Sequence, residues 1–314
     1  MNWFYKLVAF IMALFIPATV SDVAEYTTVK ENPEMVFTIL SDTHIEGNNE
    51  ERFTLFSEGL IDVNSAKRND ALIFLGDNTM NNQVIELSAF YNILNDYNKI
   101  GTVLMVAGNH DVSPNDYNFG NFEDLRERYL KFRKEHIKAQ YDDNLYYSYT
   151  INDYKFIVLS TESYSDVWQD ISDTQFTWLE NELEDAKKNN NPVFILSHYP
   201  LNHTWEDVWQ KGHIGEDSDR LYEILKNAQN QIFYFSGHLH MGLYEDHREV
   251  VFEDNITFVS VPSFGSINEV GDAPVQDHGV GHQVEVYEDE IIIRVRNFAE
   301  HKWMDVEYKV SISN

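Results

Sequence analysis

The sequence has 314 residues, of which 52 are acidic and 23 are basic, and its formal net charge is −29. This charge argues against nucleic-acid polymers and anionic membrane surfaces as partners, because their phosphates would be repelled. It leaves room for a small anionic substrate, provided that metal cations dominate the field locally. The chain contains no cysteine, which excludes disulfides, thiolate metal ligands and a cysteine nucleophile.

The first 21 residues differ from the rest of the chain. Lys6 precedes the apolar run Leu7–Ile16, and Pro17 and small residues follow. This pattern is typical of a signal peptide cleaved after Ser21. An uncleaved N-terminal anchor remains the alternative, since Trp3–Ile16 could span a bilayer with strain. Both cases predict a secreted or extracytoplasmic protein that contacts a membrane only through an uncleaved N-terminal segment.

Residues 30–314 show alternating apolar runs and amphipathic stretches without a linker, which predicts a single α/β domain with added antiparallel strands. The buried strands are expected at Met35–Ser41, Ala71–Gly76, Thr102–Gly108, Pro192–Ser197 and Gln231–Gly237. Helices are expected at Glu50–Lys67, Gln83–Asn98, Phe122–Ala139, Asp173–Lys188 and Glu216–Asn227. Further strands are expected at Tyr146–Ile151, Tyr154–Thr161, Ile291–Phe298 and Trp303–Ile312, and a rim loop at Gly265–Gln283.

Each of the five buried strands is followed by histidine or aspartate. Ligands of open α/β sheets bind beyond the carboxyl ends of the strands, so these side chains are expected to share one site. The candidate metal ligands are Asp42, His44, Asp77, Asn109, His198, His238 and His240.

Imidazole and carboxylate together suit zinc, manganese or iron better than calcium or magnesium. Residues two apart on an extended strand face the same side, which predicts that His238 and His240 aim at one point. Seven ligands exceed the needs of one catalytic zinc and divide naturally between two metal ions that share a carboxylate. Glycines 76, 108 and 237 are expected to allow sharp turns and access for substrate.

The ordered motifs "DTH", "GDN", "GNHD", "SHYP" and "GHLH" resemble those of the calcineurin-like metallophosphoesterase superfamily. The resemblance implies a four-layer α/β/β/α sandwich with two mixed sheets. It assigns one metal to Asp42, His44, Asp77 and His240, and the other to Asp77, Asn109, His198 and His238. It also implies that unligated His110 contacts the phosphate or the leaving oxygen, and that Asp111 orients the His110 ring.

The resemblance further implies a hydrolase in which hydroxide generated at two metal ions attacks phosphorus. The "GNHD" motif looks like that of the class III cyclic-nucleotide and glycerophosphodiester phosphodiesterases, whereas Met80 replaces the tyrosine of the purple, iron-binding branch. We therefore expect action on small phosphodiesters or nucleotides, with Asn109, His110 and His203 contacting substrate. A broad phosphomonoesterase and a non-catalytic extracellular metal-binding module are the alternatives.

Overall fold

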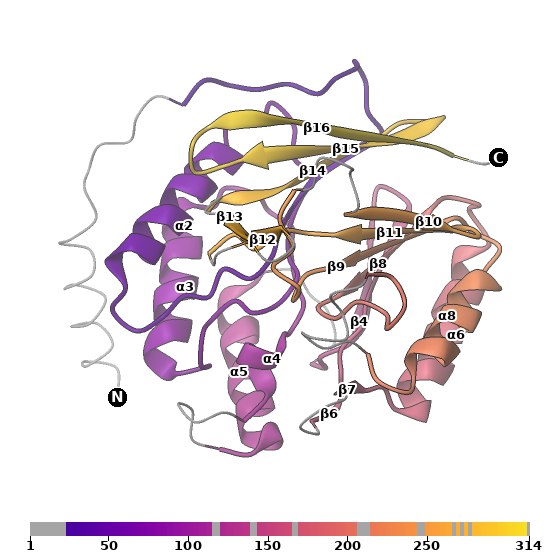
Figure 1. The fold of residues 1–314 in the computed structure, drawn as a ribbon, viewed down its shortest axis with the longest axis horizontal. Coiled ribbons are helices and arrows are strands. Elements are labelled where there is room, and N and C mark those ends of the chain that lie inside the picture. The colour runs from indigo at the N-terminus through magenta and orange to yellow at the C-terminus, as the bar shows by residue number, and fades with distance from the viewer. Residues whose placement is uncertain are drawn as a thin grey trace.

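The computed structural model describes residues 23–114, 120–138, 143–164, 169–205, 214–243, 249–265, 268–270, 273–275 and 278–312. Two six-stranded sheets lie face to face, and helices cover the outer face of each, so the molecule has four layers (Figure 1). Both sheets mix parallel and antiparallel pairs. The expected α/β/β/α sandwich with two mixed sheets is therefore confirmed.

The first sheet has the strand order β16-β15-β14-β1-β2-β3. Strands β1, β2 and β3 run parallel, whereas the three C-terminal strands are antiparallel to their neighbours. The strands are β1 (Met35–Leu40), β2 (Ala71–Phe74), β3 (Val103–Met105), β14 (Val280–Val286), β15 (Glu290–Asn297) and β16 (Lys302–Ser311). The parallel strands therefore send their carboxyl ends to one edge.

The second sheet has the order β10-β11-β9-β8-β5-β4. Its four central strands are parallel, and β4 and β10 close its two edges as antiparallel strands. The strands are β4 (Tyr147–Ile151), β5 (Tyr154–Val158), β8 (Val193–Ser197), β9 (Ile232–Ser236), β10 (Val250–Glu253) and β11 (Ile256–Ser260).

The helices cover the sheets from both sides (Figure 1). Those beside the first sheet are α2 (Glu50–Val63), α3 (Val84–Tyr97), the short α4 (Asn109–Val112) and α5 (Phe122–His136), and those beside the second are α6 (Asp173–Ala186) and α8 (Ser218–Lys226). The side chains of Asn49, Asn121 and Ser172 accept backbone N–H groups and begin α2, α5 and α6, as N-cap residues do.

Three large apolar clusters among the described residues hold these layers together. The cluster between the sheets contains Phe37, Phe156 and Phe194, whose ring centroids lie 4.9–5.2 Å apart. One further cluster lies between the first sheet and its helices, and another lies between the second sheet and α6 and α8. Because the central strands are buried on both faces, their sequences read as continuous apolar runs.

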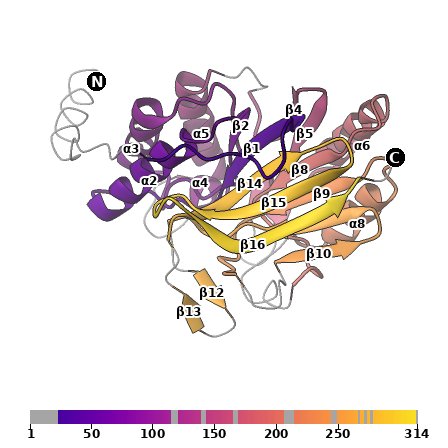
Figure 2. The same ribbon diagram turned by 90° about the horizontal axis from the view of Figure 1, so that it is seen from above.

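The sequence-based assignment missed the strands β10 and β11, which form an antiparallel pair. It also placed a rim loop over Gly265–Gln283, where the structure has β12 (Asn268–Val270), β13 (Ala273–Val275) and the start of β14. Strands β12 and β13 form a two-stranded sheet that projects from the body of the molecule (Figure 2). A second two-stranded sheet joins β6 (Ser163–Tyr164) and β7 (Gln169–Asp170).

The segment before β1 packs on the C-terminal strands of the first sheet. The Tyr26 ring lies 4.0 Å from the Arg296 guanidinium and forms an edge contact with Trp303. Arg296 in turn donates two hydrogen bonds, of 2.5 and 2.7 Å, to the buried Asp62 of α2. Within the described ranges, no helix is both long enough and apolar enough to cross a bilayer. The expected signal peptide, residues 1–21, lies outside the described residues.

Candidate metal centre

The candidate ligands follow the carboxyl ends of five parallel strands, three from the first sheet and two from the second. Asp42 and His44 follow β1, Asp77 follows β2, and Asn109 opens α4 after β3. His198 follows β8, and His238 and His240 follow β9. The packing of the two sheets brings the seven side chains into two adjoining clusters.

The first cluster consists of Asp42, His44, Asp77 and His240, whose ligand atoms all lie within 4.8 Å of one another. The His240 Nε2 atom is 3.2 Å from Asp42 Oδ1 and 3.1 Å from His44 Nε2. Two imidazole nitrogens thus face each other beside two carboxylates, an arrangement that a shared cation satisfies.

The second cluster consists of Asp77, His198 and His238, again within 4.8 Å. The His198 Nε2 atom is 3.2 Å from Asp77 Oδ2 and 3.1 Å from Asn109 Oδ1. Asn109 therefore joins this cluster through an oxygen atom. Asp77 belongs to both clusters, so its carboxylate is common to the two sets of candidate ligands.

The ionisation of these side chains fits metal ligands. Burial raises the pKa of Asp42 and of Asp77, but the neighbouring imidazoles outweigh it and hold both pKa values below the usual range. Burial lowers the pKa of His44 to about 3, so this ring is neutral. Ionised carboxylates and neutral imidazoles are the forms that bind metal.

His198 is held in the orientation that a ligand requires. Its Nδ1 atom lies 2.8 Å from the Leu75 carbonyl oxygen and donates to it, so Nε2 is the nitrogen that faces Asp77. Such a backbone contact commonly orients metal-binding histidines. Burial lowers the pKa of His198, but the Asp77 carboxylate outweighs it and raises the pKa to about 9. In the metal-free protein this ring therefore carries a proton that an ion must displace.

Five of the candidate ligands have a left-handed backbone. The φ angles are 53° at Asp42, 46° at His44, 50° at Asp77, 67° at His238 and 48° at His240. The expectation that His238 and His240 aim at one point from an extended strand is wrong, because the chain turns at both residues and the two rings enter different clusters. Left-handed backbone costs a non-glycine residue about 1 kcal/mol, so the surrounding structure must hold these turns.

The glycines beside the clusters provide space for this backbone. A Cβ atom on Gly108 would lie 2.2 Å from Asp77 Oδ1, and one on Gly237 would lie 1.9 Å from Ser41 Oγ. Gly76 also has a φ of +96°, which other residues rarely adopt. Sharp turns were expected at all three glycines, and the positive φ of Gly76 bears this out at that residue. At Gly108 and Gly237 a glycine is needed for another reason, because the side chains of Asp77 and Ser41 lie too close to leave room for a Cβ atom.

His110 lies beside the first cluster, with its ring edge-on to that of His44 and 4.8 Å away between centroids. Its Nδ1 atom lies 2.7 Å from the Met80 carbonyl oxygen. Burial lowers the pKa of His110, but the Asp77 carboxylate and this carbonyl outweigh it and raise the pKa above its ordinary value. These contacts therefore favour the protonated form of His110 next to the candidate ligands.

The expectation that Asp111 orients the His110 ring is wrong. The Asp111 carboxylate accepts hydrogen bonds from Asn78, Thr79 and the Gly108 backbone N–H instead. Burial raises its pKa to about 6. Asp111 thus ties the loop after β2 to the loop after β3, and the Met80 carbonyl fixes the ring of His110.

Comparison with known proteins identifies the family. A family model described as calcineurin-like phosphoesterase matches residues 35–242, which contain both clusters. The chain belongs to this family. It is accordingly a phosphoester hydrolase, and the Asp and His clusters imply divalent metal ions. No curated protein gives a significant match to the sequence.

Comparison with solved structures also gives matches, of which the first has a similar fold. A purple acid phosphatase from yellow lupin seeds (Lupinus luteus) matches with a TM-score of 0.62 and 13% identity, over 91% of this chain and 56% of the lupin chain. The present chain thus spans little more than half of that protein. A putative 5′-nucleotidase from Staphylococcus aureus matches with a TM-score of 0.43 and 13% identity, over 89% and 54% of the two chains. Zinc-bound Vps29 from Entamoeba histolytica matches with a TM-score of 0.39 and 12% identity, over 88% and 99%.

The structure does not bring His203 of this phosphoesterase to the metal clusters. Its Nε2 atom lies 3.5 Å from Glu253 Oε2, and its ring packs edge-on against Tyr222 of α8. None of its contacts among the described residues is with a candidate ligand. The role of His203 in substrate binding stays a prediction, and its ring is held by Glu253 and Tyr222.

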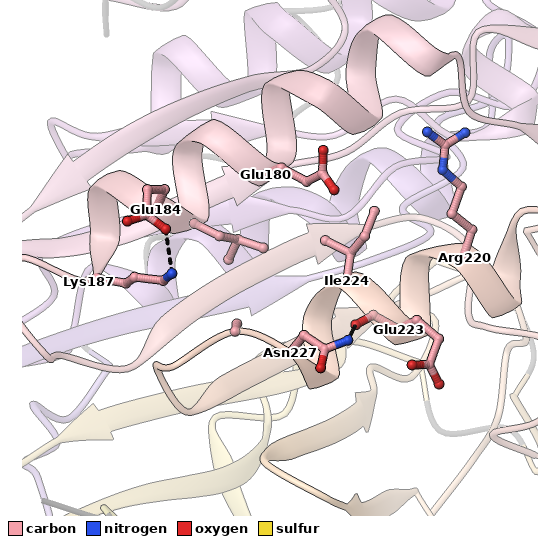
Figure 3. A pocket seen from close by; sticks show the side chains of 9 residues that line it. Glu180, Glu184, Lys187, Arg220, Glu223, Ile224 and Asn227 are labelled. Carbon is pink, nitrogen blue, oxygen red and sulfur yellow. Dashed lines mark hydrogen bonds and ion pairs between the residues drawn. The ribbon is translucent and has the colours of Figure 1, made fainter.

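A groove of about 400 Å³ lies elsewhere in the phosphoesterase, between α6 and α8 (Figure 3). Its lining includes the ion pair of Glu184 with Lys187, and charges of both signs from the two helices. No candidate metal ligand is among its lining residues. The groove is therefore separate from the metal centre.

Proposed function

We propose that this phosphoesterase hydrolyses small phosphodiesters or nucleotides at a centre of two metal ions. The observation that carries the proposal is that two ligand clusters share the carboxylate of Asp77. The donor set contains imidazole, carboxylate and amide groups, which favours manganese, iron or zinc. When bound, two such cations polarise a phosphoryl group and lower the pKa of a coordinated water.

The protein's own groups then supply position and a proton. Because Nδ1 of His110 donates to the Met80 carbonyl, Nε2 is the atom available to a phosphoryl or leaving-group oxygen. Its raised pKa supports a role as general acid. Asn109, held beside His198, is the second side chain expected to contact substrate.

The preference for small substrates rests on charge. With 52 acidic and 23 basic residues, the chain has little positive surface with which to hold a nucleic-acid backbone. The preference for diesters rests on the "GNHD" motif alone. The side chain of Met80 lacks the phenol that binds iron in the purple enzymes. The backbone carbonyl of Met80 has a separate role, since it orients the ring of His110.

We also propose that the folded part acts outside the cytoplasm. The support is the sequence of residues 1–21, with Lys6 before the apolar run Leu7–Ile16. N-terminal sequencing of protein recovered from a secreting host tests this proposal. A mature N-terminus at Asp22 is expected, and an intact N-terminus in a soluble, cytoplasmic fraction would contradict it.

The activity is tested with bis-p-nitrophenyl phosphate, p-nitrophenyl phosphate and cyclic AMP, each with added Mn²⁺ and with EDTA. The expected result is metal-dependent hydrolysis with the highest kcat/KM on a diester. A higher kcat/KM on p-nitrophenyl phosphate would indicate the phosphomonoesterase instead. Metal binding without hydrolysis of any of the three would indicate the non-catalytic module and contradict the proposal.

A further inference from the structure

Two loops of the centre are joined directly by their backbones. In the loop after β1, His44 and Ile45 donate hydrogen bonds to the carbonyls of Asp77 and Asn78, at 2.9 and 3.1 Å. In the loop after β2, Met80 donates to the Ile45 carbonyl at 2.9 Å. This junction fixes two ligands relative to each other, and it also places the carbonyl that orients His110.

Glu86 in the first turn of α3 is bonded to both loops. Its carboxylate accepts hydrogen bonds from the backbone and side-chain nitrogens of Asn81, at 2.8 and 3.0 Å, and from the backbone of Gln83 at 3.2 Å. It also accepts from the backbone of Gly47, at 3.3 Å. Only 1% of Glu86 is exposed, so the hydrogen bonds from these uncharged N–H groups replace the water that the buried carboxylate has lost.

Arg52 in the first turn of α2 holds the same junction from the other side. Its Nη1 atom donates to the carbonyl oxygen of His44, whose backbone is left-handed. Its Nε atom lies 3.9 Å from Glu46. Burial lowers the pKa of Arg52, and the charges of Glu46 and Glu86 oppose this change. The cation thus lies within the electrostatic range of the buried Glu86 carboxylate.

We infer that Glu86 and Arg52 are positioning residues, which hold the loops after β1 and β2 in the geometry that metal binding requires. Neither side chain is a candidate ligand, and neither belongs to a motif that identified the family. They act through the backbone of Gly47, Asn81 and His44. The inference rests on the proposed two-metal centre, but it concerns metal binding and not hydrolysis.

The test is a Co²⁺ titration of the metal-free full chain, followed by visible absorption, because the Co²⁺ spectrum reports the geometry of its ligands. Glu86→Gln is expected to weaken Co²⁺ binding about 10- to 100-fold, as loss of outer-sphere contacts does, and to change the spectrum. Asp96→Asn is the matched control, since it removes an exposed carboxylate from the same helix. Far-UV circular dichroism of both variants should equal that of the wild type.

Arg52→Lys keeps the positive charge but loses the planar guanidinium. Like Glu86→Gln, it is expected to weaken Co²⁺ binding. Arg126→Lys, the same change at a residue that pairs with Glu123 on α5, is its control. If Glu86→Gln does not fold, Arg52→Lys decides the question. Folded variants that bind Co²⁺ with wild-type affinity and spectrum would overturn the inference. Normal Co²⁺ binding by the wild type without hydrolysis of any phosphoester would overturn the proposed function and leave this inference standing.

Discussion

Gly108→Ala adds a single methyl group at the carboxyl end of β3, beside the shared carboxylate. Gly108 has a φ of −102° and a ψ of −179°, which alanine adopts readily, so the effect of the substitution is steric. The new Cβ atom would lie 2.2 Å from Asp77 Oδ1 and 2.5 Å from the Asp77 backbone nitrogen. Real contacts of this kind are no shorter than 3.0 Å, so the carboxylate or the turn must move by about 1 Å.

A displacement of this size at a catalytic centre costs about 100-fold in rate. Because Asp77 belongs to both clusters, Gly108→Ala should lower kcat/KM for bis-p-nitrophenyl phosphate about 100-fold at saturating Mn²⁺. It should also weaken Mn²⁺ binding at both sites. Steady-state kinetics and a Mn²⁺ titration of the metal-free protein measure the two effects separately.

Gly101→Ala provides the control, because Gly101 precedes the same strand and a Cβ atom there would meet nothing within 4 Å. This variant should keep both the activity and the metal affinity of the wild type. The reasoning fails if folded Gly108→Ala retains wild-type kcat/KM and Mn²⁺ affinity, since the carboxylate then tolerates a methyl group at contact distance.

Four further predictions rest on particular contacts. Asp77→Asn should reduce metal-dependent hydrolysis to background, since both clusters lose their shared carboxylate, while the circular dichroism spectrum stays unchanged. Full activity of the metal-replete variant would refute the proposal that Asp77 bridges two metal ions. Metal uptake at pH 7.5 should release the proton of His198, because the pKa of this ring is raised to about 9 in the metal-free protein. A pH indicator in weak buffer measures the release. Metal binding without proton release would contradict the role of His198 as a ligand. Because the folded pKa of His198 exceeds its ordinary 6.5, its contribution to the stability of the metal-free fold should be complete below about pH 6.5 and lost as the pH rises through 9. Asp62→Asn leaves the buried Arg296 without its carboxylate and should cost about 3–5 kcal/mol in urea unfolding, whereas the exposed Asp96→Asn should cost little.

The positions of the candidate ligands could be predicted because their signals are local. A run of apolar residues marks each buried strand, and the polar residue that follows it marks the strand's carboxyl end. Asp42, Asp77 and His198 were all found in this way, and the structure brings them together. Strands β10 and β11 give weak signals, because β10 is an edge strand of four residues with Phe252 exposed, and the apolar residues of the five-residue β11 are interrupted by Thr257.

Residue roles that depend on tertiary contacts could not be predicted in the same way. Asp111 is adjacent to His110 in the sequence, but its carboxylate faces Asn78 and Thr79 across the neighbouring loop. The group that orients His110 is a backbone carbonyl of Met80, and a carbonyl leaves no mark in the sequence. His203 follows His198 closely, yet the chain carries it to α8 and β10.

The left-handed backbone at five ligands explains why sequence spacing alone gave the wrong direction for His238 and His240. At about 1 kcal/mol each, these five turns together cost a sizeable part of the 5–15 kcal/mol that stabilises a typical domain. Aspartate and histidine tolerate this backbone better than most residues, and they are also good metal ligands, so the same side chains satisfy both requirements. The turns are then held by contacts that form only when the loops meet, such as those from Ser41 and the His238 backbone N–H to the Asp42 carboxylate. The identity of the candidate ligands is therefore encoded locally, whereas the assignment of each one to one of the two clusters arises from the packing of the two sheets.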